Sequence, residues 1–242
     1  MARPLYIAGD VHLNGSPNAF DGWLDTLAAQ PLPGHLVILG DLFDYWLDTA
    51  RMRARYADSL ARLRRLRDQG WDLDFVLGNR EMGGGSRLRI ATGCQVHWPG
   101  LDIRRGEQVI RIVHGDRLCH DPGYHFLHAV LTSFWVRVAI WTTPGAVQEW
   151  VGSRIRRSSR GNRHRLEQAA TPRRIGASRD MLDERRVRAS ARGADVLIAG
   201  HIHERTRMDI VGVDLLLVGE WSADTGSWVE VDGDGTLRQL SL

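Results

Sequence analysis

Five short runs of Val, Ile and Leu, each ending in a polar cluster, constrain the fold of this chain more than any other feature. They are PLYIAGDVH (4–12), HLVILGD (35–41), DLDFVLGN (72–79), VIRIVHGD (109–116) and DVLIAGHIH (195–203). Runs of this length bounded by glycine predict interior strands that are buried on both faces. Apolar residues recur every three or four positions over 48–69 and 20–29, which predicts amphipathic helices between the early strands. The alternation indicates a layered α/β fold with a mixed sheet.

The second half of the chain follows two other patterns. Residues 207–242 contain short apolar segments and a DGDG turn, which predict antiparallel strands. Residues 121–192 are helical by pattern and rich in arginine and aromatic residues. Aromatic residues at helical spacing belong more often to a core than to a ligand site. We nevertheless interpret 121–192 as a cap inserted over the strand ends, with 1–120 and 193–242 forming the core domain.

Charge is distributed unevenly along the sequence. Between 150 and 192 there are thirteen arginines and four acidic residues, a net charge of +9, so the rest of the chain carries −6 of the overall +3. A basic segment on an otherwise acidic protein indicates an anionic partner, which is a phosphate, a lipid surface or nucleic acid.

Composition narrows the class of protein and the compartment. With 242 residues, 43% of them hydrophobic, the chain is long enough for one large α/β domain or two small ones, and neither disorder nor a fibrous architecture fits. Two cysteines, Cys94 and Cys119, cannot make a disulfide framework, and no signal peptide follows Met1, so we expect a cytoplasmic protein. The longest apolar stretch, 126–141, is interrupted by charge and is shorter than the ~20 residues of a membrane span.

Potential metal ligands stand at the ends of the five apolar runs. They are Asp10, His12, Asp41, Asn79, His114, His201 and His203, with Asp44 following Asp41. Residues i and i+2 of a strand point the same way, so the D-x-H and H-x-H pairs can each present two ligands to one cavity. A lone histidine is usually a core or surface residue, and a lone strand-terminal Asp usually caps a helix. Seven such residues at the ends of five strands are unlikely to arise by chance, and together they predict a metal site.

The chemistry of these side chains predicts two ions. Carboxylate, amide and imidazole groups without thiolate exceed the four ligands of one tetrahedral ion and suit a pair of divalent ions. We expect Mn, with Fe or Zn as alternatives. Two ions about 3.5–4 Å apart are a recurrent arrangement for in-line attack on phosphorus. The sequence therefore predicts hydrolysis of a phosphoric ester.

The series D-x-H, GD-x-x-D, GN, H and GH-x-H resembles the signature of the calcineurin-like metallophosphoesterases, in the order expected along the chain. The resemblance implies a metallophosphoesterase-type layered α/β-β/α sandwich with a helical cap insertion. It also implies that one ion is held by Asp10, His12 and His203, the other by Asn79, His114 and His201, and that Asp41 bridges them.

Within that superfamily the chain is similar, almost end to end, to the UDP-2,3-diacylglucosamine hydrolases, which are pyrophosphatases of lipid A synthesis. The motifs that carry this similarity are GDLFDYW (40–46), GNR before an acid, HGD-x-L-C-x-D (114–121), RIRRSS (154–159) and GEW…GSWVEV (219–231). Most of the superfamily has His after the Asn, whereas this chain has Arg80. A guanidinium can clamp oxygens of both phosphates but cannot deliver a proton at neutral pH. An ion pair with Glu81 alone is the alternative role for Arg80.

Three features depart from the pattern of that family. Glu81 stands where the family usually has Asp, Gly83–Gly85 replace bulkier residues, and the loop between Cys119 and Tyr124 is one residue shorter. The three glycines either line a shallow wall of the acyl pocket or form a turn. Because the metal ligands are unaffected, the departures bear on acyl-chain preference.

The resemblance implies a specific reaction. A hydroxide that bridges the ions attacks the α-phosphorus of UDP-2,3-diacylglucosamine and gives UMP and 2,3-diacylglucosamine 1-phosphate. The expected catalytic residues are Asp41, Asn79, Arg80 and His114. The expected substrate contacts are Arg80, Asp121, Tyr124, Arg157, Ser159, Arg160 and Arg163. The aromatic insertion would house the acyl chains, and the enzyme would lie peripherally on the anionic inner face of the cell membrane.

Two rival functions stay open at this point. A metallophosphoesterase of soluble nucleotides or nucleic acid would use the basic insertion to follow phosphates, although nucleic acid is the less expected partner. A binding module that has lost catalysis would be expected to lose ligands, and all seven are present. The sequence predicts no oligomeric state.

Overall fold

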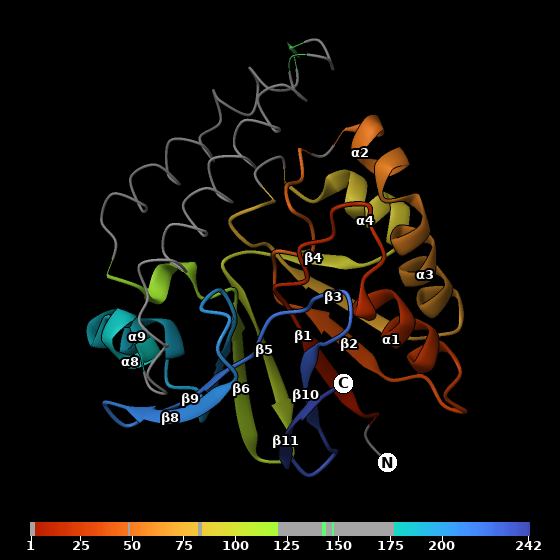
Figure 1. Ribbon diagram of the computed structural model, residues 1–242. Coiled ribbons are helices and arrows are strands. Elements are labelled where there is room, and N and C mark those ends of the chain that lie inside the picture. The colour runs from red at the N-terminus through yellow and green to blue at the C-terminus, as the bar shows by residue number, and fades with distance from the viewer. Residues whose placement is uncertain (1–2, 48, 82–83, 121–141, 144–146, 148–176) are drawn as a thin grey trace.

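The computed structural model describes residues 3–47, 49–81, 84–120, 142–143, 147 and 177–242. In this part of the chain two β-sheets pack face to face, and helices cover the outer face of each sheet (Figure 1). The layers are therefore helix, sheet, sheet and helix, and the predicted α/β-β/α sandwich is confirmed.

The first sheet has six strands in the order β11-β10-β1-β2-β3-β4. They are β1 (Leu5–Ala8), β2 (His35–Ile38), β3 (Asp72–Val76), β4 (Gln95–His97), β10 (Ser227–Val231) and β11 (Leu237–Ser241). Strands β1 to β4 are parallel, with Leu5 opposite His35 and His35 opposite Asp72. Strands β10 and β11 form an antiparallel pair that adds to β1.

The second sheet has five strands in the order β5-β6-β7-β9-β8. They are β5 (Gly100–Arg105), β6 (Gln108–Val113), β7 (Val196–Ala199), β8 (Thr206–Ile210) and β9 (Val213–Leu217). Strands β6, β7 and β9 are parallel, and the edge strands β5 and β8 are antiparallel to their neighbours. Val211 and Gly212 connect β8 to β9, and both have positive φ, as tight hairpin turns require.

Helices lie outside the two sheets. They are α1 (Ala19–Ala28), α2 (Ala50–Arg55), α3 (Ala57–Asp68), α4 (Ser86–Thr92), the 3₁₀ turn η1 (Asp116–Leu118), α8 (Ala177–Met181) and α9 (Glu184–Ala191). The side chain of Asn18 caps α1 by accepting from the N–H of Phe20. The single helix predicted over 48–69 is wrong, because Tyr56 (φ −111°, ψ 24°) leaves the helical conformation and separates α2 from α3.

Alternation along the central strands divides the apolar side chains among three clusters. On β1, Leu5 and Ile7 lie between the two sheets, whereas Tyr6 and Ala8 pack with the helices of the first sheet. A third cluster lies between the second sheet and α9. Burial on both faces explains why these strands appear in the sequence as continuous apolar runs.

The structure places the predicted elements as follows. The five apolar runs are β1, β2, β3, β6 and β7, and the antiparallel strands predicted near the end of the chain are β8 to β11. The predicted insertion, 121–192, lies mostly outside the described residues. In its described end, Leu182 and the α9 residues Val187 and Ala191 pack against the second sheet. The cap itself stays a prediction.

Candidate metal centre

The loops after β1, β2, β3, β6 and β7 carry the seven candidate ligands, and five of these have unusual backbone. The five with positive φ are Asp10 (52°), His12 (54°), Asp41 (49°), His201 (70°) and His203 (61°). Among the other non-glycine residues that the structure describes, only Arg192 and Val211 share this conformation. Such backbone costs about 1–2 kcal/mol per residue and concentrates at functional sites. The fold therefore holds these side chains in positions that ordinary strand backbone would not give.

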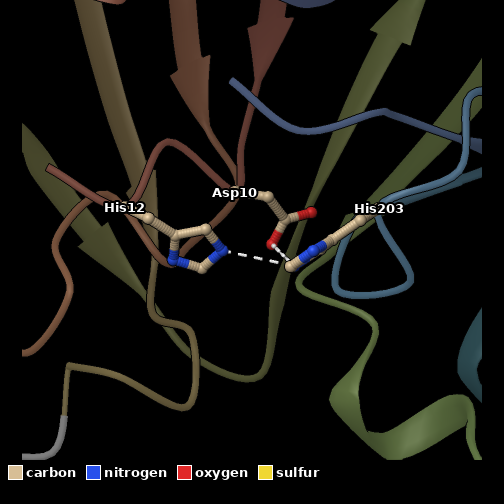
Figure 2. A group of neighbouring side chains, drawn as sticks. All are labelled: Asp10, His12 and His203. Carbon is tan, nitrogen blue, oxygen red and sulfur yellow. Dashed lines mark hydrogen bonds and ion pairs between the residues drawn. The ribbon is translucent and has the colours of Figure 1, made fainter. Parts of the chain in front are cut away.

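Asp10, His12 and His203 form the first group (Figure 2). Their ligand atoms lie within 4.8 Å of one another, and Nε2 of His12 is 3.2 Å from Nε2 of His203. Two nitrogens that each lie about 2.1 Å from one ion, at right angles or at a tetrahedral angle, are about 3.0–3.4 Å apart. Oδ1 of the fully buried Asp10 has no hydrogen-bond partner among the described residues. The group therefore fits a divalent cation.

Asp41, His114 and His201 form the second group, which Asn79 joins. The amide of Asn79 places one atom 2.8 Å from Nε2 of His114, 3.2 Å from Nδ1 of His201 and 3.2–3.3 Å from both carboxylate oxygens of Asp41. When that atom is the amide oxygen, acceptors converge on one point, and a cation satisfies them all. When it is the amide nitrogen, it donates to the same atoms. This arrangement also fits a divalent cation.

Hydrogen bonds to the far side of the ligands fix their orientation. Nδ1 of His114 lies 2.9 Å from the carbonyl oxygen of Leu39, so the N–H donates there and Nε2 faces the second group. Gly40 (φ 86°) permits this approach, since a Cβ at Gly40 would lie 2.6 Å from Nδ1 of His114. Nδ1 of His203 lies 3.0 Å from Oε2 of Glu220, which leaves Nε2 for the first group.

Buried charges shift the pKa values of the second group in opposite directions. Burial raises the pKa of Asp41, but the cations of His114, His12 and Arg80 outweigh burial and lower it. Burial lowers the pKa of His114, but Asp41 and then Asp116 raise it to about 9. The buried carboxylates therefore favour positive charge at this position, which is also what a metal ion would supply.

The pKa of His201 shifts in the opposite direction to that of His114. Burial, and next the charge of His114, lower the pKa of His201 to about 4. Its imidazole is therefore neutral at pH 7, which is the form that binds a metal ion. The candidate ligands differ in charge state even though they lie side by side.

Glu81 connects the loops after β2 and β3. It is 3% exposed, and its Oε2 accepts from the N–H groups of Asp41 and Gly78 at 3.0 Å while Oε1 accepts from Leu42 at 3.1 Å. Burial, and next the charge of Asp41, raise the pKa of Glu81. Glu81 therefore binds backbone amides. The ion pair of Arg80 is made with Asp41, so the alternative pairing with Glu81 alone is wrong.

Two residues that position the ligands were not singled out for that role by the sequence. In the sequence, Glu81 stands out only as a departure from the family pattern. The one signal for its role is that an acidic residue follows GNR directly. Glu220 lies within the GEW motif, but nothing in that motif indicates a contact with His203. Both contacts join segments far apart in the chain, so local pattern does not reveal them.

Most expected substrate contacts lie outside the described residues. They are Asp121, Tyr124, Arg157, Ser159, Arg160 and Arg163. Arg80 is described, and it donates from Nε to Asp41 at 3.2 Å and from Nη1 to the carbonyl of Asp44 at 3.1 Å. Its side chain is 21% exposed, so the guanidinium lies at the edge of the second group and remains reachable.

Comparison with known proteins defines the class. The sequence model of the calcineurin-like phosphoesterases matches residues 3–205, a span that includes both ligand groups. The chain belongs to this family, as its motifs indicated, and is a metal-dependent phosphoester hydrolase.

Curated relatives extend the similarity over nearly the whole chain. A UDP-2,3-diacylglucosamine hydrolase of Neisseria meningitidis serogroup B is 27% identical over 241 residues, which cover 97% of each chain. The protein of the same name from Haemophilus influenzae strain Rd is 25% identical over 239 residues, 95% of each chain. A solved archaeal phosphodiesterase aligns over 99% of both chains with a TM-score of 0.47 and 11% identity.

Among the described residues, no helix combines the length and the apolar character needed to cross a bilayer.

Proposed function

We propose that this enzyme hydrolyses the pyrophosphate of UDP-2,3-diacylglucosamine to UMP and 2,3-diacylglucosamine 1-phosphate. The observation that carries the proposal is the end-to-end similarity to relatives named for that substrate. Water attacks the α-phosphorus, the bond from that phosphorus to the bridging oxygen breaks, and the sugar 1-phosphate leaves as an anion. A phosphate leaving group needs little protonation, which agrees with an arginine rather than a histidine after Asn79.

Seven side chains would hold two ions, for which we propose Mn. Asp10, His12 and His203 hold the first ion, Asn79, His114 and His201 hold the second, and Asp41 is shared. The charges of His12 of the first group and of His114 of the second both lower the pKa of Asp41, so this carboxylate interacts electrostatically with both groups. When bound, the ions supply a nucleophilic water at neutral pH and neutralise charge on the phosphoryl oxygens.

Arg80 would orient the diphosphate. A guanidinium has five N–H donors, and the hydrogen bonds to Asp41 and Asp44 use two of them. Within the described part of the chain the other three donors make no hydrogen bond, so they can bind phosphate oxygens on both sides of the bond that breaks. Because the Asp41 contact fixes the guanidinium before substrate arrives, little conformational freedom is lost on binding.

We also propose that the protein binds the anionic inner face of the cell membrane, where a lipid substrate resides. The net charge of +9 between 150 and 192 supports this location. In the described part of that segment, α9 carries Arg185, Arg186 and Arg188. Co-sedimentation with anionic vesicles at low salt tests the proposal. Protein that stays in the supernatant at low salt would contradict it.

Turnover of UDP-2,3-diacylglucosamine beside a panel of soluble nucleotide diphosphates, with and without added Mn, tests the activity. The proposal expects UMP and the sugar 1-phosphate as products, and it expects the rate to depend on Mn. Faster hydrolysis of the soluble nucleotides would favour the alternative, a metallophosphoesterase of soluble nucleotides or nucleic acid.

A further inference from the structure

A pocket of about 300 Å³ adjoins the candidate metal centre. It is lined by residues of the loops 11–18 and 221–223, together with Asp44 and Arg80. His12 of the first ligand group is part of the lining, so the pocket opens directly beside the ions' expected position. A chemical group bound in this pocket could be linked by a covalent bond to a phosphate that Arg80 holds, because Arg80 also lines the pocket.

The side chains that line this pocket suit one half of a lipid-linked nucleotide better than the other. Asn14, Ser16, Asn18 and Ser222 contribute neutral polar groups, and the formal charges of Asp44 and Arg80 cancel. Acyl chains need a continuous apolar wall, which this lining does not provide. A run of phosphates needs an excess of positive charge. A neutral polar group of modest size fits the pocket best, and the volume is at the lower end for small-molecule sites.

Trp221 is the buried aromatic residue of this lining and is 4% exposed. It forms part of the wall, and the neutral polar side chains beside it offer hydrogen-bond donors and acceptors. A nucleoside, with carbonyl, N–H and hydroxyl groups, can bond with such side chains.

The surroundings of Trp221 hold its ring in place. The ring packs against Phe20 and Trp23, with centroids 5.1 and 5.2 Å away. A Cβ at Gly226 would lie 2.0 Å from the indole, so glycine is needed for the ring to occupy this position. The backbone N–H of Trp221 donates to the carbonyl of Asp10 at 3.2 Å, which ties the pocket wall to the ligand loop. The pocket is therefore preformed.

We propose that this pocket binds the uridine half of the substrate, with the neutral polar side chains of its lining in contact with uracil and ribose. The inference rests on the proposed function and assigns the nucleoside to the loops 11–18 and 221–223. The acylated sugar then extends away from these loops on the other side of the diphosphate.

Binding of uridine itself tests the assignment, because uridine lacks phosphate and needs no metal ion. Saturation-transfer NMR measures uridine beside N-acetylglucosamine on the wild type and two variants. Ala223→Leu adds bulk to an exposed residue of the lining and should weaken uridine binding about tenfold or more. Circular dichroism verifies the fold of Ala223→Leu.

A matched control comes from a second pocket of about 260 Å³, which is lined by arginines and includes the exposed Ala189 of α9. Ala189→Leu makes the same change outside the proposed subsite and should leave uridine binding unchanged. Uridine that binds Ala223→Leu as tightly as the wild type overturns the assignment. So does a wild type that binds N-acetylglucosamine but not uridine.

Kinetics separate this inference from the proposed function. In Ala223→Leu, kcat/KM for UDP-2,3-diacylglucosamine should fall about tenfold more than kcat/KM for bis(p-nitrophenyl) phosphate, which has no nucleoside. A wild type that binds uridine in an Ala223-dependent way but does not cleave the lipid substrate contradicts only the proposed function. Cleavage of the lipid substrate with equal losses toward both substrates contradicts only the subsite.

Discussion

The guanidinium of Arg80 donates from Nε to Oδ2 of Asp41 at 3.2 Å, and the backbone N–H of Arg80 donates to Oδ1 of the same carboxylate at 3.0 Å. The residue that is expected to clamp the diphosphate is thus fixed to the residue that is expected to join the two ions. Substrate orientation and metal binding therefore both depend on the carboxylate of Asp41. A mutation of Arg80 that leaves Asp41 in place can separate the two roles.

Replacement of Arg80 by Lys should lower kcat/KM for UDP-2,3-diacylglucosamine about 10- to 100-fold. Lysine keeps the charge but loses the planar fork and at least one charge-assisted hydrogen bond, which is worth about 1.5–3 kcal/mol. Steady-state kinetics with saturating Mn measures the effect. Arg64→Lys, on the exposed face of α3, is the control and should behave as the wild type. Full activity of Arg80→Lys would contradict the clamp.

Replacement of Glu81 by Asp should destabilise the protein. The shorter side chain cannot reach the amides of Asp41, Gly78 and Leu42 together, and each buried amide left unpaired costs about 1–3 kcal/mol. The melting temperature should fall by roughly 2–4 °C for each kcal/mol. Differential scanning calorimetry beside the exposed control Glu107→Asp measures the change. An unaltered melting temperature would show that the carboxylate does not support these loops.

Replacement of Glu220 by Gln should weaken metal binding about 10- to 100-fold, because the contact with Nδ1 of His203 orients the ring and increases its basicity. Isothermal titration calorimetry with Mn measures the affinity. Asp224→Asn changes a nearby exposed acid in the same loop and should retain wild-type affinity. Equal affinities for wild type and Glu220→Gln would exclude this orienting role.

Asp74 should make the folded state sensitive to acid. Burial raises its pKa, but hydrogen bonds from His35 at 2.5 Å and His97 at 2.6 Å outweigh burial and lower the pKa below the ordinary 3.8. The ionised carboxylate therefore stabilises the protein above pH 3.8, and this stability is lost as the pH falls through the lower folded-state pKa.

Urea denaturation near neutral pH and at about pH 3 measures this dependence. The free energy of unfolding of Asp74→Asn should be lower than that of the wild type near neutral pH, and the difference should shrink in acid. Asp224→Asn, which changes an exposed carboxylate in the loop before β10, serves as the control. A difference that grows in acid would contradict the assigned direction of the pKa shift.

Most of the strands, and the convergence of the seven candidate ligands, could be predicted from the sequence because burial on both faces gives the central strands a clear signal. β4 and β5 were missed because their partly exposed residues give short or alternating patterns. The break at Tyr56 was also missed, since its buried ring preserves the apolar periodicity on both sides. The contacts of Glu81 with Asp41 and of Glu220 with His203 depend on tertiary approach, which no local pattern encodes.

Anomalous diffraction from crystals soaked in Mn shows whether seven side chains from five strand ends hold two ions. We expect two peaks per chain, one between His12 and His203 and the other between His114 and His201. Asp41→Ala should weaken both peaks. A single peak elsewhere, or no peak at saturating Mn, would exclude a pair of ions at these residues.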